Sequence, residues 1–245
     1  MTIFSAGCSF SDVWVPAHTS FGEIIANKFN QDYDSSAVET AGSNDRIFRV
    51  LTQKILDKEI TSNDTVLIQY TDTIRREFCS WYKPVGPGFT SDQDAEKWSV
   101  YRADGSKKDD KWIVKYFGQG MEILDKTHNK DLLKAIHDYR TWFDSGNHDF
   151  YIFNQRHLHF QTFLDYHKIT NVYFLLLNFY CDSKIYHNDP LDFIANYRNR
   201  VYEDRDIGKM DNEWYLPDDN RHLSQHGHNV LADRIYEWIN KGCAE

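Results

Sequence analysis

Two short stretches, far apart in the sequence, hold the residues whose types and spacing suit hydrolytic chemistry. The first is Gly7-Cys8-Ser9-Phe10-Ser11, which follows a short apolar run. The second is Asp219-Asn220-Arg221-His222-Leu223-Ser224, with Gly227 and His228 behind it. A serine hydroxyl is a weak nucleophile unless a base lies within hydrogen-bond reach, and a histidine held by a carboxylate is such a base. The second stretch can supply that base and its orienting carboxylate from one loop.

The segment before the first stretch indicates where Ser9 would lie in the fold. Residues Thr2 to Ala6 predict a short β-strand, so Ser9 would follow the carboxyl end of a strand. In an open α/β sheet this edge is where ligands bind. Gly7 would let the backbone turn sharply there, which leaves the serine side chain clear. A Gly-x-Ser sequence occurs by chance in many chains, and the second stretch is what gives it weight.

The rest of the chain alternates between strand-like and helix-like segments. Further strands are predicted at 36–41, 64–70 and 171–179, with a brief edge strand at 213–216. Helices are predicted after the capping box Ser20-Phe21-Gly22-Glu23, after a cap at Ser43 or Asn44, across 132–143 and 150–164, and from Ser224 to a stop at Gly242. This alternation predicts an α/β fold, a three-layer α/β/α sandwich around a parallel sheet with right-handed crossovers.

The alternation is interrupted from about residue 71 to 120, where prolines, glycines and aromatic residues gather. Irregular segments of this length are usually functional lids or small subdomains. We therefore expect one domain over residues 1–245 with an aromatic-rich insertion at about 71–120. Aromatic side chains there, such as Trp81 and Trp98, could stack on sugar rings or enclose an acyl chain, although packing of a small lid is the favoured interpretation.

Composition narrows the classes of partner. The net charge of −9 over 245 residues, with no basic cluster, predicts neither a nucleic-acid partner nor binding to an anionic membrane. No apolar run is long enough to span a bilayer and no charged start precedes one, so neither a membrane segment nor a signal peptide is expected. The four cysteines show no Cys-x-x-Cys spacing, which suits reduced thiols in a cytoplasmic protein.

The placement of these motifs resembles the SGNH (GDSL-type) hydrolase superfamily. The matching blocks are Gly7-Cys8-Ser9-Phe10-Ser11, Gly42-Ser43-Asn44, and Asp219 to Ser224 with Gly227. The resemblance implies a flavodoxin-like α/β/α sandwich that hydrolyses acyl esters without a cofactor. It also implies that Ser9 is the nucleophile, that His222 is the general base and then acid, and that Asp219 fixes the imidazole. The backbone N–H groups of Ser9 and Gly42 would face the oxyanion.

One block departs from the family pattern. Where the third strand should lead into Gly-x-Asn-Asp, this chain has Tyr70-Thr71-Asp72-Thr73, so the asparagine that donates to the oxyanion is missing. An ionised Asp72 can only accept hydrogen bonds, whereas Thr71, Thr73 and Asn44 can donate them. We rank Thr71 first and Asn44 second as the substitute donor, because Thr71 lies nearest the strand end and its side chain is short and stiff.

The sequence thus predicts a serine hydrolase acting on a small-molecule or carbohydrate ester, an O-acylated carbohydrate being one candidate substrate. The alternatives are an acyltransferase, in which an alcohol replaces water, and a non-catalytic relative that binds a glycan or a protein. A metal site at His222, His226 and His228, or at His157 and His159, is not expected. The first set straddles a helix start and lacks tight ligand spacing. His157 lies on an apolar helical stripe and is expected in the core.

Overall fold

The computed structural model describes residues 1–8, 10–13, 15–38, 43–71, 75–80, 112–117, 146–177, 200–204, 212–217 and 219–243. Within these ranges only the backbone is described for 75–80, 112–117, 146–150, 203–204, 212 and 219–221. The chain divides into two compact units. The first comprises Met1–Asp72 together with Arg156–Glu245, and the second comprises Thr73–Gln155.

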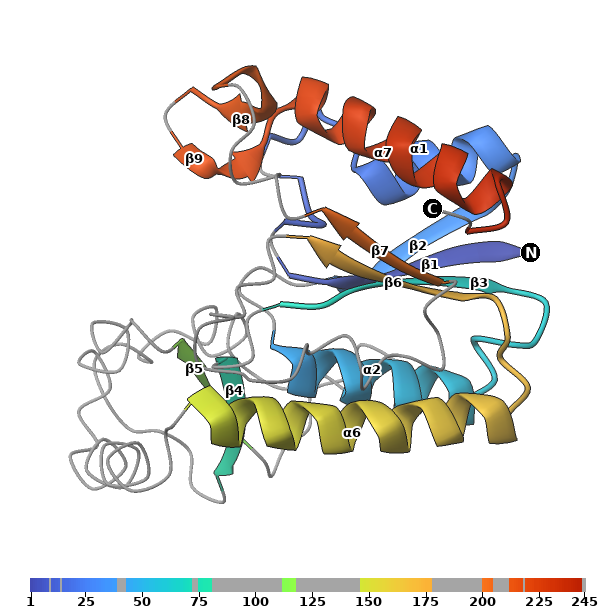
Figure 1. Cartoon of the computed structure of the whole chain (residues 1–245), viewed down its shortest axis with the longest axis vertical. Coiled ribbons are helices and arrows are strands. Elements are labelled where there is room, and N and C mark those ends of the chain that lie inside the picture. Colours follow the sequence, from blue (N-terminus) through green and yellow to red (C-terminus); the bar gives the residue numbers. More distant parts are fainter. Residues whose placement is uncertain are drawn as a thin grey trace. The chain divides into compact units, whose positions relative to one another are not determined.

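A five-stranded sheet forms the centre of the first unit (Figure 1). Its strands are β1 (Thr2–Gly7), β2 (Asp32–Val38), β3 (Thr65–Gln69), β6 (Val172–Leu177) and β7 (Val201–Asp204). They lie in the order β2-β1-β3-β6-β7, and every neighbouring pair is parallel. This order is one of the two common ones in doubly wound α/β sheets, whose ligands bind beyond the carboxyl ends of the strands.

Helices cover both faces of this sheet (Figure 1). Helices α1 (Phe21–Phe29) and α7 (Gln225–Asn240) lie against one face, and α2 (Asn44–Leu56) with residues 156–166 of α6 (Gly146–Tyr166) lies against the other. On the second face the ring of Phe48 from α2 packs against Phe160 of α6 at a centroid distance of 5.2 Å. The structure is therefore α/β with a parallel sheet, and it is compatible with the predicted three layers.

Serine caps start three of the helices, as the sequence predicts. The Oγ atoms of Ser20, Ser43 and Ser224 accept hydrogen bonds from backbone N–H groups in the first turns of α1, α2 and α7, at 3.1–3.2 Å. Ser43 is the cap of α2, and Asn44 is the first residue of that helix. Each cap satisfies a donor that the helix start would otherwise leave unpaired.

One apolar cluster fills the space between the sheet and the α1–α7 layer. Its buried members come from the strands, from both helices and from the connecting segments, and they are Ile3, Cys8, Phe10, Phe21, Ile25, Ala26, Leu67, Leu175, Leu177, Trp214, Leu223, Leu231, Ala232 and Ile235. We call this set the upper cluster. It includes residues from both of the stretches that the sequence singles out.

The second unit contains a two-stranded antiparallel ribbon, β4 (Arg75–Ser80) and β5 (Trp112–Phe117), and the first ten residues of α6. The insertion predicted at about 71–120 lies almost wholly within this unit. Trp81 and Trp98 and the helix predicted at 132–143 lie outside the described residues.

Two predicted segments are wrong in detail. The second strand was expected at 36–41, but β2 begins earlier, at Asp32, because this edge strand is largely polar with a single buried residue and lacks the apolar run that marks a buried strand. Residues 39–41 of the predicted strand lie outside the described residues. The segment that carries Asp219 and His222 was expected to be a loop. It is a short strand, β9 (Asp219–Leu223), which pairs with β8 (Tyr215–Leu216) after the 3₁₀ turn η5 (Asn212–Trp214).

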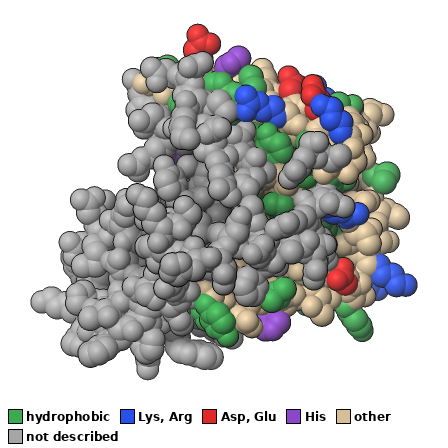
Figure 2. All heavy atoms as spheres, in the orientation of Figure 1, with side chains coloured by type: hydrophobic (Ala, Val, Ile, Leu, Met, Phe, Trp, Pro, Cys, Tyr) green, Lys and Arg blue, Asp and Glu red, His purple; other side chains and the backbone are tan. Residues whose placement is uncertain are grey.

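Among the residues that Figure 2 colours by type, acidic and basic side chains lie next to one another on the face that it shows. Among the helices that the structure describes, none is long and apolar enough to cross a membrane.

Candidate active site

The segment that follows β1 is fastened to the end of β3 by one glutamine. The side-chain oxygen Oε1 of Gln69 accepts the backbone N–H of Cys8 at 3.1 Å, the Cys8 thiol at 3.3 Å and the Ser11 hydroxyl at 3.0 Å. A backbone hydrogen bond of 2.9 Å from Ser11 N to Cys8 O joins the residues on either side of positions 9 and 10. Gln69 is 2 % exposed, so these bonds are shielded from water.

Gly7 is needed here for space. A Cβ atom at this position would lie 2.5 Å from the Ser11 hydroxyl and 2.8 Å from Gln69 Oε1, both too close for a side chain. Gly7 is not among the described residues with positive φ, so the reason predicted from the sequence, freedom to turn sharply, does not apply. The glycine instead lets the segment after β1 approach β3 closely.

Asn44 and Thr71, two residues that the sequence predicts for the site, hold the start of α2 against the segment that follows the carboxyl end of β3. Asn44 Nδ2 donates to the Thr71 carbonyl at 2.8 Å, and the Thr71 N–H donates to Asn44 Oδ1 at 2.9 Å. Both residues are 4 % exposed. None of the described residues is hydrogen-bonded to the Thr71 hydroxyl.

His222 lies half-buried on β9, and the pairing of β9 with β8 is irregular around it. Tyr215 pairs with Leu223, but the next residue, Leu216, pairs with Asp219, so three residues of β9 stand opposite none of β8. Such bulges re-aim side chains and are frequent beside active sites. They also remove the strict alternation of a regular strand, which would place side chains three residues apart on opposite faces.

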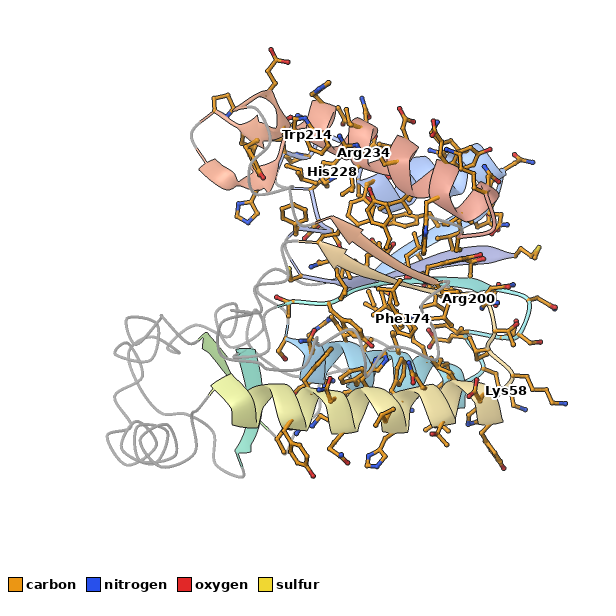
Figure 3. All side chains as sticks on the ribbon, in the orientation of Figure 1. Lys58, Phe174, Arg200, Trp214, His228 and Arg234 are labelled. Carbon is orange, nitrogen blue, oxygen red and sulfur yellow. The ribbon has the colours of Figure 1, made fainter. Side chains whose placement is uncertain are left out.

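The end of β9 is fixed by its junction with α7. Ser224 N donates to the Trp214 carbonyl at 2.8 Å, and Ser224 Oγ caps the helix. Gly227 packs so closely on the same carbonyl that no Cβ would fit. Trp214 itself is covered by Arg234, whose guanidinium lies 4.9 Å from the ring centroid (Figure 3). His222 therefore belongs to a strand whose following turn is tightly packed.

The upper cluster brings the two stretches to one region of the first unit. Cys8 and Phe10, the neighbours of Ser9 in sequence, belong to this cluster together with Leu223, the neighbour of His222. The start of α7 also holds the segment before α1, since Gln225 Oε1 accepts the Thr19 N–H at 2.7 Å. Sequence neighbours of the predicted nucleophile and of the predicted base thus share one core.

Of the six residues predicted for the site, Asn44 and Thr71 are in direct contact and His222 lies on β9. Asp219 is the first residue of β9, and its side chain is outside the described part. Ser9 and Gly42 lie outside the described residues.

The histidines considered for a metal occupy different surroundings. His228 is 1 % exposed, and its Nδ1 accepts the Phe21 N–H at 3.3 Å, whereas His226 is exposed. Burial, with a smaller effect from His18, lowers the pKa of His228 to about 4. His157 is fully buried and lies 2.6 Å from the Tyr70 hydroxyl, as expected for a core histidine. Within the described part of the chain, no three His, Cys, Asp or Glu residues gather in a way that could hold a metal.

Gln69 is the residue of this site that sequence reasoning missed. It ends the otherwise apolar run Val66-Leu67-Ile68 of a buried strand, and a polar residue in such a position needs hydrogen-bond partners. That signal marks Gln69 as unusual, but it does not tell which segment its partners come from.

No protein-family model matches this chain, and no curated protein or solved structure is detectably similar to it.

Proposed function

We propose that this chain is a serine hydrolase of the SGNH type, with the corresponding α/β/α fold, that cleaves an acyl ester. The observation that supports this most directly is the upper cluster, to which Cys8 and Phe10 from beside Ser9 and Leu223 from beside His222 all belong. The strand order and the parallel sheet add support, since ligands of such sheets bind at the carboxyl edge from which the Ser9 segment leaves.

In the proposed reaction Ser9 Oγ attacks the carbonyl carbon of the ester while His222 takes the hydroxyl proton. His222 then gives that proton to the departing alcohol, which leaves an acyl group on Ser9. A water molecule attacks this acyl group while His222 takes its proton. His222 then returns the proton to Ser9 Oγ as the bond to the acyl group breaks, and the carboxylic acid is released. Asp219 would hold the imidazole in the orientation that both steps need.

The negative charge that forms on the carbonyl oxygen needs hydrogen-bond donors. The resemblance assigns the backbone N–H groups of Ser9 and Gly42 to this role, and the Thr71 hydroxyl is the proposed third donor. It stands beside Asn44, close to the end of β3, and it is uncommitted among the described residues. The substrate class is an ester of a small molecule or carbohydrate, and no cofactor takes part.

Labelling with a fluorophosphonate tests the proposal, because this probe phosphonylates serines that an adjacent base activates. Wild-type protein should be labelled on the peptide that contains Ser9, and mass mapping should place the adduct on Ser9 and not on Ser11. The Ser9→Ala variant should lose both the labelling and the hydrolysis of p-nitrophenyl acetate while its melting temperature is retained. Unchanged turnover in Ser9→Ala would refute the assignment.

A second candidate function is a binding domain that has lost the reaction. The departure Tyr70-Thr71-Asp72-Thr73 favours it, because the family's donor asparagine is missing at the end of β3. Folded wild-type protein that neither reacts with the probe nor hydrolyses any short-chain ester would support this alternative over the hydrolase.

A further inference from the structure

The oxygen of Gln69 is the point where both flanks of position 9 are attached to the sheet. Cys8 contributes its backbone N–H and its thiol, and Ser11 contributes its hydroxyl, at 3.0–3.3 Å from the same Oε1 atom. One acceptor that receives three donors restrains the segment on both sides of Ser9. Neither the catalytic roles nor the oxyanion donors proposed above use Gln69.

The orientation of the Gln69 amide is itself fixed. Its Nε2 donates to the Tyr70 carbonyl at 2.7 Å, so its oxygen must face the segment after β1. A reversed amide would bring oxygen against a carbonyl oxygen and an N–H group against the Cys8 N–H, which can only donate. Tyr70 cannot easily follow such a change, because it is fully buried and its hydroxyl lies 2.6 Å from His157 Nδ1.

Close packing around Gly7 and Cys8 leaves the segment after β1 little room to shift. Gly7 leaves no room for a Cβ between Ser11 and Gln69, and Cys8 is 5 % exposed within the upper cluster. The burial of Gln69 means that water cannot replace its oxygen as the acceptor without a rearrangement. The donors on Cys8 and Ser11 therefore depend on this one side chain.

We propose that Gln69 is a positioning residue for the nucleophile, holding the Ser9 segment so that its hydroxyl stays in the geometry that reaction requires. This role rests on the proposed hydrolase function. Displacement of a reacting group by about 1 Å is enough to lower a rate by about 10²-fold. A residue that touches neither substrate nor the reacting atoms can thus govern the rate through Cys8 and Ser11.

The test compares Gln69→Met, which keeps the length of the side chain and removes the acceptor, with Ser11→Ala, which removes one of the three donors. Gln161→Met is the matched control. Gln161 is also a buried glutamine, 4 % exposed, but it contacts His157 on α6 and not the Ser9 segment. The measurements are the rate of phosphonylation at Ser9, kcat and KM for p-nitrophenyl acetate, and the rate of thiol modification at Cys8.

Gln69→Met should lower kcat and the phosphonylation rate by about 10²-fold, with KM within about twofold, because the substrate contacts are unchanged. The Cys8 thiol, released from its acceptor, should react faster with a thiol reagent. Ser11→Ala should lower the phosphonylation rate by a smaller factor, and it should have no further effect in the Gln69→Met background, since both act through the same bond. Gln161→Met should leave all three readouts at the wild-type values.

Different outcomes overturn different claims. A wild-type protein that is not labelled at Ser9 refutes the proposed function, and the role of Gln69 falls with it. Wild-type labelling with an unchanged rate in the Gln69 and Ser11 variants refutes the role of Gln69 alone, even if Cys8 becomes reactive. If Gln69→Met does not fold, Ser11→Ala decides, because an unchanged phosphonylation rate in that mild variant is enough to reject the proposal.

Discussion

Asn44 and Thr71 show how two neighbouring residues of one site can have separate tasks. The Asn44 amide both donates to and accepts from the backbone of Thr71, which fixes the start of α2 against the end of β3. The Thr71 hydroxyl makes no hydrogen bond to any of the described residues. These contacts favour Thr71 over Asn44 as the donor to a developing oxyanion, in the order that the sequence suggests.

Replacing Thr71 by Ala should therefore lower kcat by about 10²–10³-fold with little change in KM, because a donor used mainly in the transition state is lost. Thr71→Ser keeps the hydroxyl and should retain most of the activity. Steady-state kinetics on a short-chain ester provide the measurement. Full activity in Thr71→Ala would remove the hydroxyl from the proposed mechanism.

Asn44→Ala should act on stability before it acts on chemistry. It leaves the buried N–H and carbonyl of Thr71 without their partners, at a cost of about 1–3 kcal/mol for each unsatisfied group. The free energy of unfolding, measured by urea denaturation, should fall accordingly. Gln53→Ala, an exposed change on the same helix, should have almost no effect. Equal stabilities of the two variants would contradict this structural task.

At the scale of elements, the junction of β9 with α7 is the most constrained connection of the candidate site. Gly227 in the first turn of α7 packs on the Trp214 carbonyl, which also accepts the N–H of Ser224. A backbone carbonyl cannot rotate away as a side chain can. The position of β9, and of His222 on it, therefore depends on the absence of a side chain at residue 227.

Gly227→Ala should displace this junction and destabilise the fold by about 1–3 kcal/mol, as overpacked core substitutions do. Because the displacement is next to β9, the phosphonylation rate at Ser9 should fall as well. Asn240→Ala, at the exposed end of the same helix, is the control and should change neither quantity. A Gly227→Ala protein with wild-type melting temperature and labelling would show that the junction of β9 with α7 accommodates a side chain at residue 227.

The sequence predicts an element well where the element has its own local pattern, and poorly where its structure depends on pairing with a neighbouring strand. The buried runs of β3 and β6 and the serine caps of α1, α2 and α7 were predicted, since apolar runs and caps are local properties. The start of β2 and the strand character of β9 were not predicted. β2 is a polar edge strand, and β9 is short, irregular and paired to a two-residue strand, so neither has a period to detect.

The same distinction separates the residues of the site. Ser9 and His222 were singled out because their motifs are contiguous in sequence. Gln69 was missed because its three donors come from residues 58 to 61 positions away, and no local pattern records such a contact. The space that Gly7 leaves for Ser11 and Gln69 likewise exists only in the folded chain.

At the scale of the first unit, two buried histidines lie on opposite sides of the sheet. His157 belongs to the α2–α6 layer and His228 to the α1–α7 layer. Burial lowers the pKa of each to about 4, against an ordinary value of 6.5. Between these two pH values the unfolded chain binds protons that the folded chain does not.

The free energy of unfolding should therefore be unaffected by these two histidines above about pH 6.5 and should decrease as the pH falls towards 4, because the folded chain keeps both imidazoles neutral. Each histidine contributes up to about 1.4 kcal/mol per pH unit within that window. Urea denaturation between pH 7 and 4.5 measures the slope. His228→Gln should reduce it by about half, and His226→Gln, at an exposed position, should not. An equally steep slope in His228→Gln would assign the acid sensitivity to other groups.

The parts of the candidate site are not made at the same time. Ser9, Asn44, Gln69 and Thr71 all leave the ribosome at least about 150 residues before His222. At roughly 5–20 residues per second this interval lasts roughly 8–30 s. During it the growing chain would hold a serine without a base, which is a poor nucleophile. The proposed hydrolysis could therefore not begin until β9 has emerged and α7 has packed on the upper cluster, so unfinished chains would pose no hazard to esters around them.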